Sequence, residues 1–467
     1  MSETAHLLRD VYAVDPRAGL AGVATIAVEG GAIASLAWRD GAAAAAARWR
    51  DGAQPLADDP GLLLLPALVD LHAHFRQPGA TASEDAASGS RAAAHGGYGT
   101  VCLMANTEPA IDRPERLAAA IALQGAVAGG SPAVRLLPIG AATVDHGGSV
   151  VAPLARLAAA GAVAFSDDGS PIADRAVFLE ALLAAAGAGR PLIEHCEVPE
   201  LSAGGEAADG LVATRLGLRP WRAVAEVEAV ERAIGALREA VTQHPAARLH
   251  LTHLSTAAGI DLVRRARTEG LPASCDVTPH HIALTDRWLA GDRHWSWEVD
   301  DGDPLAVDDG SAYATSLRVC PPLRSASDAA ACRAALRDGT AVAIATDHAP
   351  HSRERKEVEF GLAANGIAGI ETSLSVALAA HAAGEISLAR LAAALTTGPA
   401  DLLGLAEIVP GFAVGAPADL VLVDRTAAWV PGRDTLAGRS INTPLVGRLL
   451  PGVVRLTLHG GAVAWEG

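Results

Sequence analysis

The feature that most constrains the fold is a regular alternation between about residues 62 and 350. Short apolar runs rich in Leu, Ile and Val alternate with Ala- and Leu-rich segments of helical character, at intervals of roughly 30 residues. The apolar runs cover residues 62–75, 101–107, 134–141, 162–168, 191–197, 249–255, 272–281 and 342–350. Eight strand–helix units in series predict an α/β fold, specifically a TIM-like (β/α)8 barrel.

The two ends of the chain have a different pattern. The segments VATIAVEGGAIASLAW (23–38) and VVRLTLHGGAVAWEG (453–467) both read strand, Gly-Gly, strand, which is typical of tight hairpins. ADLVLVD (418–424) adds a further strand. Because an isolated hairpin is only marginally stable, we expect the ends to meet in one small β-sandwich domain. The predicted division is residues 1–61 with 411–467 for this domain and 62–410 for the barrel.

Composition excludes several classes of partner. The formal net charge is -16, and no Lys/Arg-rich stripe is present that would neutralise a phosphate backbone, so we expect no nucleic acid partner. No stretch approaches 18 uninterrupted apolar residues, and residues 1–12 lack the pattern of a signal peptide. The five cysteines are scattered without CxxC spacing, which favours reduced thiols over disulfides. We therefore expect a cytoplasmic protein with no membrane contact.

Chemically active side chains stand where the predicted strands end. In a barrel, reactive groups lie at the C-terminal ends of the strands. The residues at these ends are His72 and His74, Asn106, Asp168, His195, His253 and Asp347. The first strand continues as DLHAHFRQPG, and side chains alternate in an extended strand. His72, His74 and Arg76 are therefore expected on one face, directed into a shared mouth.

Four histidines and two aspartates at strand ends suggest a metal site. A single histidine is more often a structural residue than a ligand, but the whole set matches the imidazole and carboxylate ligands of Zn²⁺. Six ligands exceed what one tetrahedral ion takes, whereas two ions bridged by a carboxylate use them all. Mn²⁺ and Co²⁺ accept such sites as well, so the sequence does not fix the metal.

Several motifs in order resemble the amidohydrolase superfamily and, more narrowly, type I dihydroorotases. They are DLHAHFRQPG, GYGTVCLMANTEPAID, AVAFSDDGSP, IEHCE, LHLTHLST, DVTPHHIALT, PPLRS, IATDHAPH, GIAGIET and SINTPLVGRLLPG. The resemblance implies that N-carbamoyl-L-aspartate and (S)-dihydroorotate are interconverted in pyrimidine (UMP) synthesis, with two zinc ions per subunit. It implies the ligand roles as follows: His72 and His74 for the first metal, His195 and His253 for the second, Asp168 as the bridge, and Asp347 as both a ligand and the catalytic proton shuttle.

The resemblance also implies substrate contacts. In this family Arg76, Asn106 and His351 would hold the dihydroorotate carboxylate, to which a planar guanidinium binds bidentately. Without a metal site nearby, Arg76 would be read as a surface ion-pair partner. Further expected contacts are His74, Cys320, Asn365 and Gly366. Cys320 stands where the family usually has Asn before PPLR, so that contact differs here.

The bridging carboxylate is expected to come directly from an aspartate. Many related enzymes bridge their ions with a carboxylated lysine, but the chain has a single lysine, Lys356, in a charged segment that we expect to face solvent. Asp167 and Asp168 are the candidates; the family match favours Asp168, and Asp167 would point away on the alternating strand. We expect no carboxylated lysine. The acidic segment 288–316 is expected to be a flexible, solvated loop.

Two other functions and the assembly state stay open. A hydantoinase or allantoinase would share the metals and the ring opening without needing Arg76. A non-catalytic dihydroorotase-like subunit that scaffolds aspartate transcarbamoylase would be recognised by lost ligands, and all six are present here. A homodimer, and a complex of the active enzyme with aspartate transcarbamoylase, are both compatible with the sequence.

Overall fold

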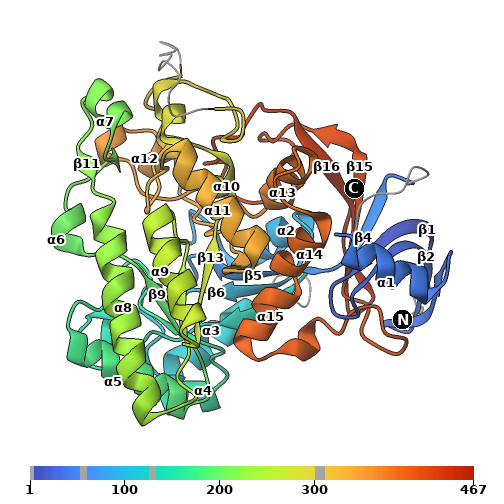
Figure 1. The fold of residues 1–467 in the computed structure, drawn as a ribbon, viewed down its shortest axis with the longest axis horizontal. Coiled ribbons are helices and arrows are strands. Elements are labelled where there is room, and N and C mark those ends of the chain that lie inside the picture. Colours follow the sequence, from blue (N-terminus) through green and yellow to red (C-terminus); the bar gives the residue numbers. More distant parts are fainter. Residues whose placement is uncertain (1–4, 53–59, 126–132, 300–310) are drawn as a thin grey trace.

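The computed structural model describes residues 5–52, 60–125, 133–299 and 311–467. Figure 1 shows two parts: a large body of strands and helices, and a sheet at one side in which the blue N-terminal and red C-terminal strands lie together. Among the described residues, no helix has both the length and the apolar character needed to cross a membrane.

Both ends of the chain form one seven-stranded sheet, of order β17-β16-β15-β4-β1-β2-β3. Its strands are β1 (His6–Asp15), β2 (Leu20–Glu29), β3 (Ala32–Trp38), β4 (Leu62–Pro66), β15 (Leu420–Trp429), β16 (Leu450–His459) and β17 (Ala462–Glu466). Both expected hairpins are confirmed, with the Gly30-Gly31 and Gly460-Gly461 pairs at positive φ in their turns. The two-layer sandwich and the exact domain boundaries stay predictions.

The eight predicted central strands are present as parallel strands in two sheets. They are β5 (Leu68–Ala73), β6 (Tyr98–Leu103), β7 (Arg135–Pro138), β8 (Phe165–Ser166), β9 (Leu192–His195), β12 (Leu249–Thr252), β13 (Ala273–Val277) and β14 (Ala341–Ile344). The sheet orders are β5-β6-β7 and β14-β13-β12-β9-β8. Isolated parallel bridges also join Gly140 to Phe165 and Ala73 to His348. This arrangement is an α/β fold consistent with a TIM-like barrel.

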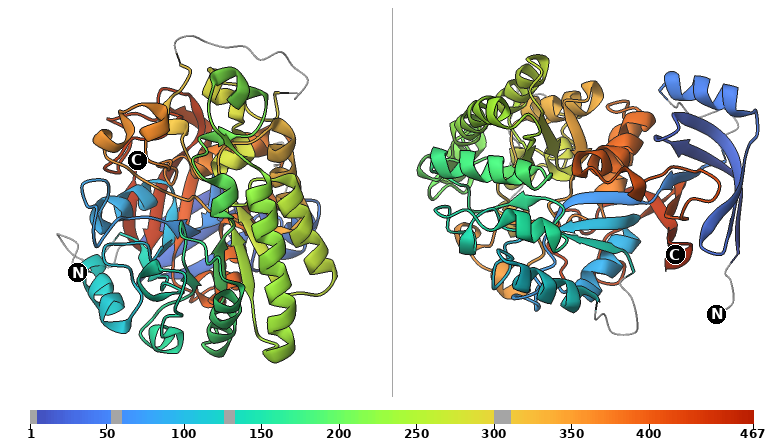
Figure 2. Two further views of the ribbon diagram at one scale, coloured as in Figure 1. Left: turned by 90° about the vertical axis from the view of Figure 1, so that its left-hand side faces the viewer. Right: turned by 90° about the horizontal axis from the view of Figure 1, so that it is seen from below.

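Helices surround these strands, as Figure 2 shows from two further directions, except α1, which packs against β2 of the terminal sheet. The helices are α1 (Ala42–Arg50), α2 (Ala86–His95), α3 (Pro114–Gly125), α4 (Leu154–Ala159), α5 (Arg175–Gly187), α6 (Pro199–Ser202), α7 (Leu211–Leu216), α8 (Val224–Gln243), α9 (Ala257–Thr268), α10 (Pro279–Ala283), α11 (Ala326–Asp338), α12 (Arg353–Lys356), α13 (Ser373–Ala382), α14 (Leu388–Leu395) and α15 (Thr397–Leu403). A short parallel pair, β10 (Ala207–Ala208) and β11 (Pro220–Trp221), lies outside both sheets. Side-chain caps fix helix starts: Asp174 accepts from two backbone N–H groups of α5, and Thr256 accepts from Gly259 N in α9.

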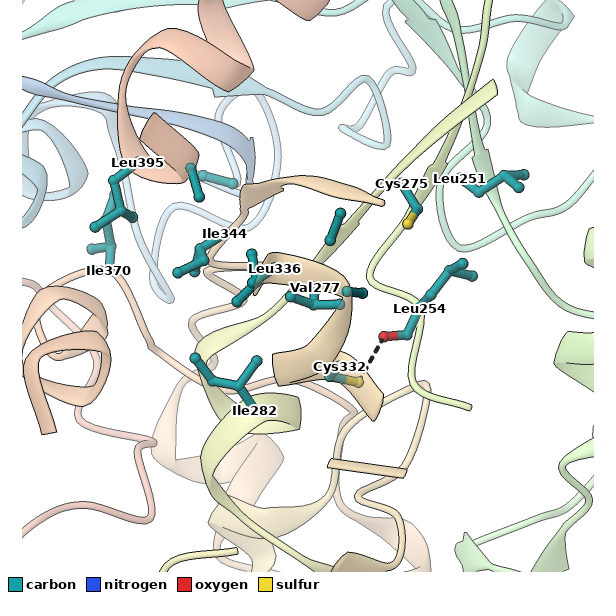
Figure 3. Close-up of a cluster of buried hydrophobic side chains, with 14 of the residues drawn as sticks. Leu251, Leu254, Cys275, Val277, Ile282, Cys332, Leu336, Ile344, Ile370 and Leu395 are labelled. Carbon is teal, nitrogen blue, oxygen red and sulfur yellow. Dashed lines mark hydrogen bonds between the residues drawn. The ribbon is translucent and has the colours of Figure 1, made fainter. Parts of the chain in front are cut away.

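The core lies between the parallel strands and their covering helices. Figure 3 shows one part, where Cys275 and Val277 of β13 and Leu336 of α11 are buried together. The thiol of Cys332 donates to the Leu254 carbonyl at 3.7 Å. Because helices and neighbouring strands cover both faces of these strands, their sequences are continuous apolar runs rather than alternating ones.

The run 62–75, expected to be one barrel strand, is instead two strands in different sheets. β4 pairs with β1 and β15 of the terminal sheet, whereas β5 pairs with β6. The change occurs at Ala67, whose N–H donates to Asp419 O, while the next N–H, of Leu68, donates to Gly97 O. The preceding Pro66 has no N–H to offer a ladder, which suits the end of a strand.

The segment 288–316 was expected to be a solvated loop, and for residues 288–299, the first of its two described parts, that expectation is wrong. Trp288 is fully buried, and the rings of Trp295 and Trp297 stack with centroids 5.2 Å apart. The guanidinium of Arg448 lies 3.9 Å from the Trp295 ring centroid. The apolar area of the tryptophans outweighs the acidic composition that suggested a solvated loop. Residues 300–310 of this segment lie outside the described residues.

Candidate metal centre

The strands deliver the predicted side chains to one end of the parallel sheets. His72 is in β5 and His74 just beyond it, His195 is the last residue of β9, and His253 directly follows β12. Asp168 follows β8, and Asp347 follows β14. All six side chains are buried or nearly so, and their donor atoms converge.

The first group of donors consists of His72, His74, Asp168 and Asp347. His72 Nε2 lies 3.2 Å from His74 Nε2 and 3.3 Å from Asp168 Oδ2. Asp347 Oδ1 lies 3.3 Å from His74 Nε2 and 3.6 Å from His72 Nε2. Ligands held 2.0–2.2 Å from one tetrahedral ion lie about 3.3–3.6 Å from one another. The observed spacings therefore fit four ligands around a single cation.

The second group uses the other oxygen of the same aspartate. Asp168 Oδ1 lies 3.4 Å from His195 Nδ1 and 3.3 Å from His253 Nε2, and these two nitrogens are 3.0 Å apart. Asp168 thus presents one carboxylate oxygen to each group. This is the geometry of a carboxylate that bridges two ions.

Hydrogen bonds on the far side of three imidazoles leave their facing nitrogens able to bind a cation. His74 Nδ1 donates to Asn106 Oδ1 at 2.9 Å, and His195 Nε2 donates to Glu197 Oε2 at 2.9 Å. His72 Nδ1 is 3.0 Å from Thr252 Oγ1. Such outer partners fix the tautomer of metal-binding histidines. Facing imidazole nitrogens 3.0–3.2 Å apart need a proton or a metal ion between them, so the donor set fits metal ions.

The electrostatics keep the carboxylates in their metal-binding form. Burial alone would raise the pKa values of Asp168 and Asp347, but the surrounding histidines lower both below the usual range. Burial lowers the pKa of His72, but the Asp168 and Asp347 carboxylates outweigh it and raise that pKa to about 9. The site therefore has a strong attraction for positive charge.

The backbone is strained at three of these positions. Arg76, His253 and Asp347 have φ values of 57°, 42° and 44°, in the left-handed region that residues with a side chain rarely adopt. Such strain costs roughly 1–2 kcal/mol per residue and concentrates at functional sites. Here the three residues directly follow β5, β12 and β14 or lie within three residues of their ends.

A cavity of about 560 Å³ opens over the centre. Most of the predicted substrate residues line it: His74, Arg76, Asn106, Cys320, Asn365 and Gly366. His351 contacts this set from a neighbouring cavity, with Nε2 2.6 Å from Asn365 O and 3.4 Å from Arg76 Nη2. Burial and the nearby guanidinium of Arg76 lower the pKa of His351 to about 3, so its ring is neutral.

The two aspartates after β8 point in different directions. Asp168 faces the histidines, whereas Asp167 accepts hydrogen bonds from the backbone N–H groups of Ala142 and Thr143 at 2.8 and 3.0 Å. The expected alternation of their side chains is confirmed.

The expectation that Lys356 faces solvent is wrong. It is buried at 5% exposure, and its Nζ donates to the carbonyls of Thr315, Arg318 and Ala364 at 2.9, 3.1 and 2.7 Å. Three carbonyl acceptors replace the lost water, which is why a charged residue in a charged segment can turn inward.

Sequence reasoning missed the residues that support the histidines. Asp276 accepts hydrogen bonds from Thr252 Oγ1 at 3.0 Å and from the backbone N–H of His253 at 2.6 Å, so it holds both residues in place. Glu197 orients His195. A signal for Glu197 was available, since the pattern His-Cys-Glu puts it two residues after a strand-end histidine. Asp276 lies in the quoted run DVTPHH, but nothing local to it indicates which residues it supports.

Comparison with solved structures shows the fold class. L-hydantoinase (dihydropyrimidinase) from Arthrobacter aurescens superposes with a TM-score of 0.78 at 22% identity, over 98% of this chain and 96% of that chain. A D-hydantoinase gives a TM-score of 0.75 at 22% identity, over 98% of this chain and 95% of that chain. At this identity the likeness concerns the fold alone. The chain therefore has an amidohydrolase-type α/β fold, with a centre lined by histidines and carboxylates.

Sequence relatives narrow this class. The family model described as "Dihydro-orotase-like" matches residues 61–258. A dihydroorotase of Anaeromyxobacter dehalogenans is 40% identical over 453 residues, which is 97% of this chain and 96% of that protein. A dihydroorotase of Elusimicrobium minutum is 34% identical over 99% of this chain and 98% of that protein. The chain belongs to the dihydroorotase family.

Proposed function

We propose that this protein is a dihydroorotase, which reversibly cyclises N-carbamoyl-L-aspartate to (S)-dihydroorotate in de novo pyrimidine (UMP) biosynthesis. The observation that carries the proposal is the convergence of six donor residues, five of which line a cavity that also contains Arg76. The relatives at 34–40% identity over nearly the whole chain have this name.

His72, His74, Asp168 and Asp347 would hold one divalent cation, and Asp168, His195 and His253 a second. Zn²⁺ suits these ligands best, and Mn²⁺ or Co²⁺ would substitute. When bound, two such ions supply Lewis acidity and lower the pKa of a bound water. No carboxylated lysine is needed, because Asp168 offers one oxygen to each group and Lys356 is hydrogen-bonded to three carbonyls elsewhere.

Asp347 is the proposed proton shuttle. Its ionised carboxylate lines the cavity and is held by His74, so it would take a proton from the attacking water and deliver it to the ring amide nitrogen as the C–N bond breaks. In the cyclising direction the same carboxylate would take the proton from the ureido nitrogen and return it to the departing water. Protons balance in both directions.

Arg76 is the proposed anchor of the substrate carboxylate. Burial lowers its pKa to about 10, so the guanidinium stays charged at neutral pH. Its Nε donates to Pro350 O at 3.3 Å, which fixes the side chain over the cavity. Asn106, His351, Asn365 and Gly366 would complete the contacts, with His74 and Cys320 on the flanking walls.

The closest competing function is a hydantoinase- or allantoinase-type amidohydrolase. The solved structures named above share the fold, and a neutral ring would leave the Arg76 charge in the cavity unpaired, which is costly. A substrate panel decides the matter: purified protein loaded with zinc should open dihydroorotate much faster than hydantoin or allantoin. Faster turnover of hydantoin or allantoin would refute the assignment. Absence of turnover on every substrate would favour the non-catalytic scaffold.

Further parts of the proposal concern architecture and assembly. We propose that the eight parallel strands close into a (β/α)8 barrel, supported by the bridges at Gly140 and Ala73. A cytoplasmic location fits the five free cysteines. A homodimer and a complex with aspartate transcarbamoylase stay predictions.

A further inference from the structure

Three metal-binding side chains meet on the outer side of His195, away from the bridging aspartate. They are His195, Glu197 and Cys320, and their ligand atoms all lie within 4.8 Å of one another. His195 Nε2 lies 2.9 Å from Glu197 Oε2, and Cys320 Sγ lies 3.7 Å from the same oxygen. All three line the cavity.

Two protons converge on one carboxylate oxygen in this cluster. The imidazole Nε2–H and the Cys320 thiol both donate to Glu197 Oε2. The other oxygen, Oε1, accepts from Ser202 Oγ, which holds the carboxylate in place. A divalent cation that replaced both protons would leave the charge of the cluster unchanged. Its binding would release one proton from the thiol and one from the imidazole, so His195 would become an imidazolate with Nε2 toward this cation and Nδ1 toward Asp168.

The donor set selects the kind of cation. Thiolate, imidazole and carboxylate together suit Zn²⁺ or Cd²⁺, whereas Mg²⁺ and Ca²⁺ prefer oxygen alone. Zinc–ligand distances of about 2.0–2.3 Å put ligands of one ion about 3.3–3.7 Å apart. The 2.9 and 3.7 Å separations lie close to this range, so small side-chain adjustments would suffice. Three protein ligands leave one position open toward the cavity.

We propose that His195, Glu197 and Cys320 form a third metal site, distinct from the two bridged by Asp168, which takes Zn²⁺ or Cd²⁺ at excess metal and inhibits turnover. Inhibition follows from position, because an ion on this cavity wall would occupy space and charge where the anionic substrate must lie. The binding site rests on these three residues alone, whereas its effect on turnover rests on the proposed function.

The site is tested by titrating Cd²⁺ into protein that has first been loaded with two equivalents of Zn²⁺. Thiolate-to-Cd²⁺ charge transfer gives an ultraviolet band that reports a cysteine ligand. Cys320 is the suitable reporter, because Cys102, Cys196, Cys275 and Cys332 are buried. We expect a band that saturates at one Cd²⁺ per chain in the wild type, is absent in Cys320→Ser, and is retained in Cys196→Ser, the matched change beside His195.

Cys320→Asn provides a second variant if Cys320→Ser does not fold. No band in the wild type, or a band of equal size in a folded Cys320 variant, would overturn the site. Failure to turn over dihydroorotate would refute the proposed function but would leave the band unaffected, so the two failures are distinguishable.

The inhibitory effect is measured separately, as the rate at excess Zn²⁺ divided by the rate of the same variant at two equivalents. This ratio removes any change in basal rate. We expect the zinc concentration for half inhibition to rise by about tenfold or more in Cys320→Ser, since one strong ligand is lost. Equal inhibition in wild type and Cys320→Ser would overturn the inhibitory role.

Discussion

Replacing Lys356 by methionine removes a buried charge whose pKa the fold has shifted strongly. Burial, with a smaller effect from Arg318, lowers the Lys356 pKa from 10.5 to about 7. Between these values the unfolded chain binds a proton that the folded chain has released. The contribution of Lys356 to the free energy of unfolding therefore rises with pH across this window, by about 1.4 kcal/mol per pH unit and about 5 kcal/mol in total.

The hydrogen bonds of Lys356 act in the opposite direction to the cost of its burial. The methionine variant leaves the carbonyls of Thr315, Arg318 and Ala364 without this donor, at about 1–3 kcal/mol each. Near pH 7 this loss and the relief of the buried charge are of similar size, so we expect a net change within about 2 kcal/mol. As pH rises, the charge cost disappears from the wild type alone. The stability difference in favour of the wild type should grow by about 2.7 kcal/mol between pH 7.5 and 9.5.

The assay is urea unfolding followed by tryptophan fluorescence at pH 7.5, 8.5 and 9.5. Other titrating groups cancel in the difference between wild type and variant, and no other lysine is present. Arg355→Met removes an exposed cation from the same helix, α12, and its difference from the wild type should not change with pH. A pH-independent difference for Lys356→Met would refute the argument from burial.

Three further results follow from the centre. Asp347→Asn should lower turnover by about 10²–10⁴-fold with at most partial metal loss, as measured by steady-state kinetics and metal analysis. Near-normal turnover in this variant would remove Asp347 from the mechanism. Arg76→Met should lower kcat/KM for dihydroorotate by roughly 10²-fold, whereas turnover of hydantoin should change far less. An equal loss with dihydroorotate and hydantoin would argue against recognition of the carboxylate by Arg76. Asp168→Ala should lose metal and activity, whereas Asp167→Ala should keep its metal. Zinc uptake by metal-stripped wild-type protein should not depend on bicarbonate. A dependence on bicarbonate would favour a carboxylated lysine as the bridge.

Much of the central fold could be predicted because parallel strands covered on both faces have continuous apolar sequences. Each of the eight runs contains a strand of the structure, and the Gly-Gly hairpins were recognisable from local turn chemistry. The division of residues 62–75 was not predictable in this way, because both halves are equally apolar and only pairing with distant strands separates them. The packing of Trp295 under Arg448 likewise depends on a partner more than 150 residues away in sequence.

The candidate site could be predicted from the sequence for a related reason. Residues at the ends of parallel strands meet regardless of loop length, so His72, His195 and His253 could be grouped before any distance was known. The residues that support these histidines could not be predicted in this way, because hydrogen-bond partners such as Asp276 depend on side-chain direction in three dimensions. Lys356 shows the same limit: composition predicts exposure for a lysine in a charged segment, while three converging carbonyls make burial feasible.

The most direct test of the proposed binuclear dihydroorotase is a zinc titration of metal-stripped protein, with dihydroorotate hydrolysis measured at each addition. The proposed centre predicts no activity without metal, a maximum at two Zn²⁺ per chain, and a decline when further zinc fills the site at Cys320. Full activity in metal-free protein, or a maximum at one Zn²⁺ per chain, would contradict the two-metal centre bridged by Asp168.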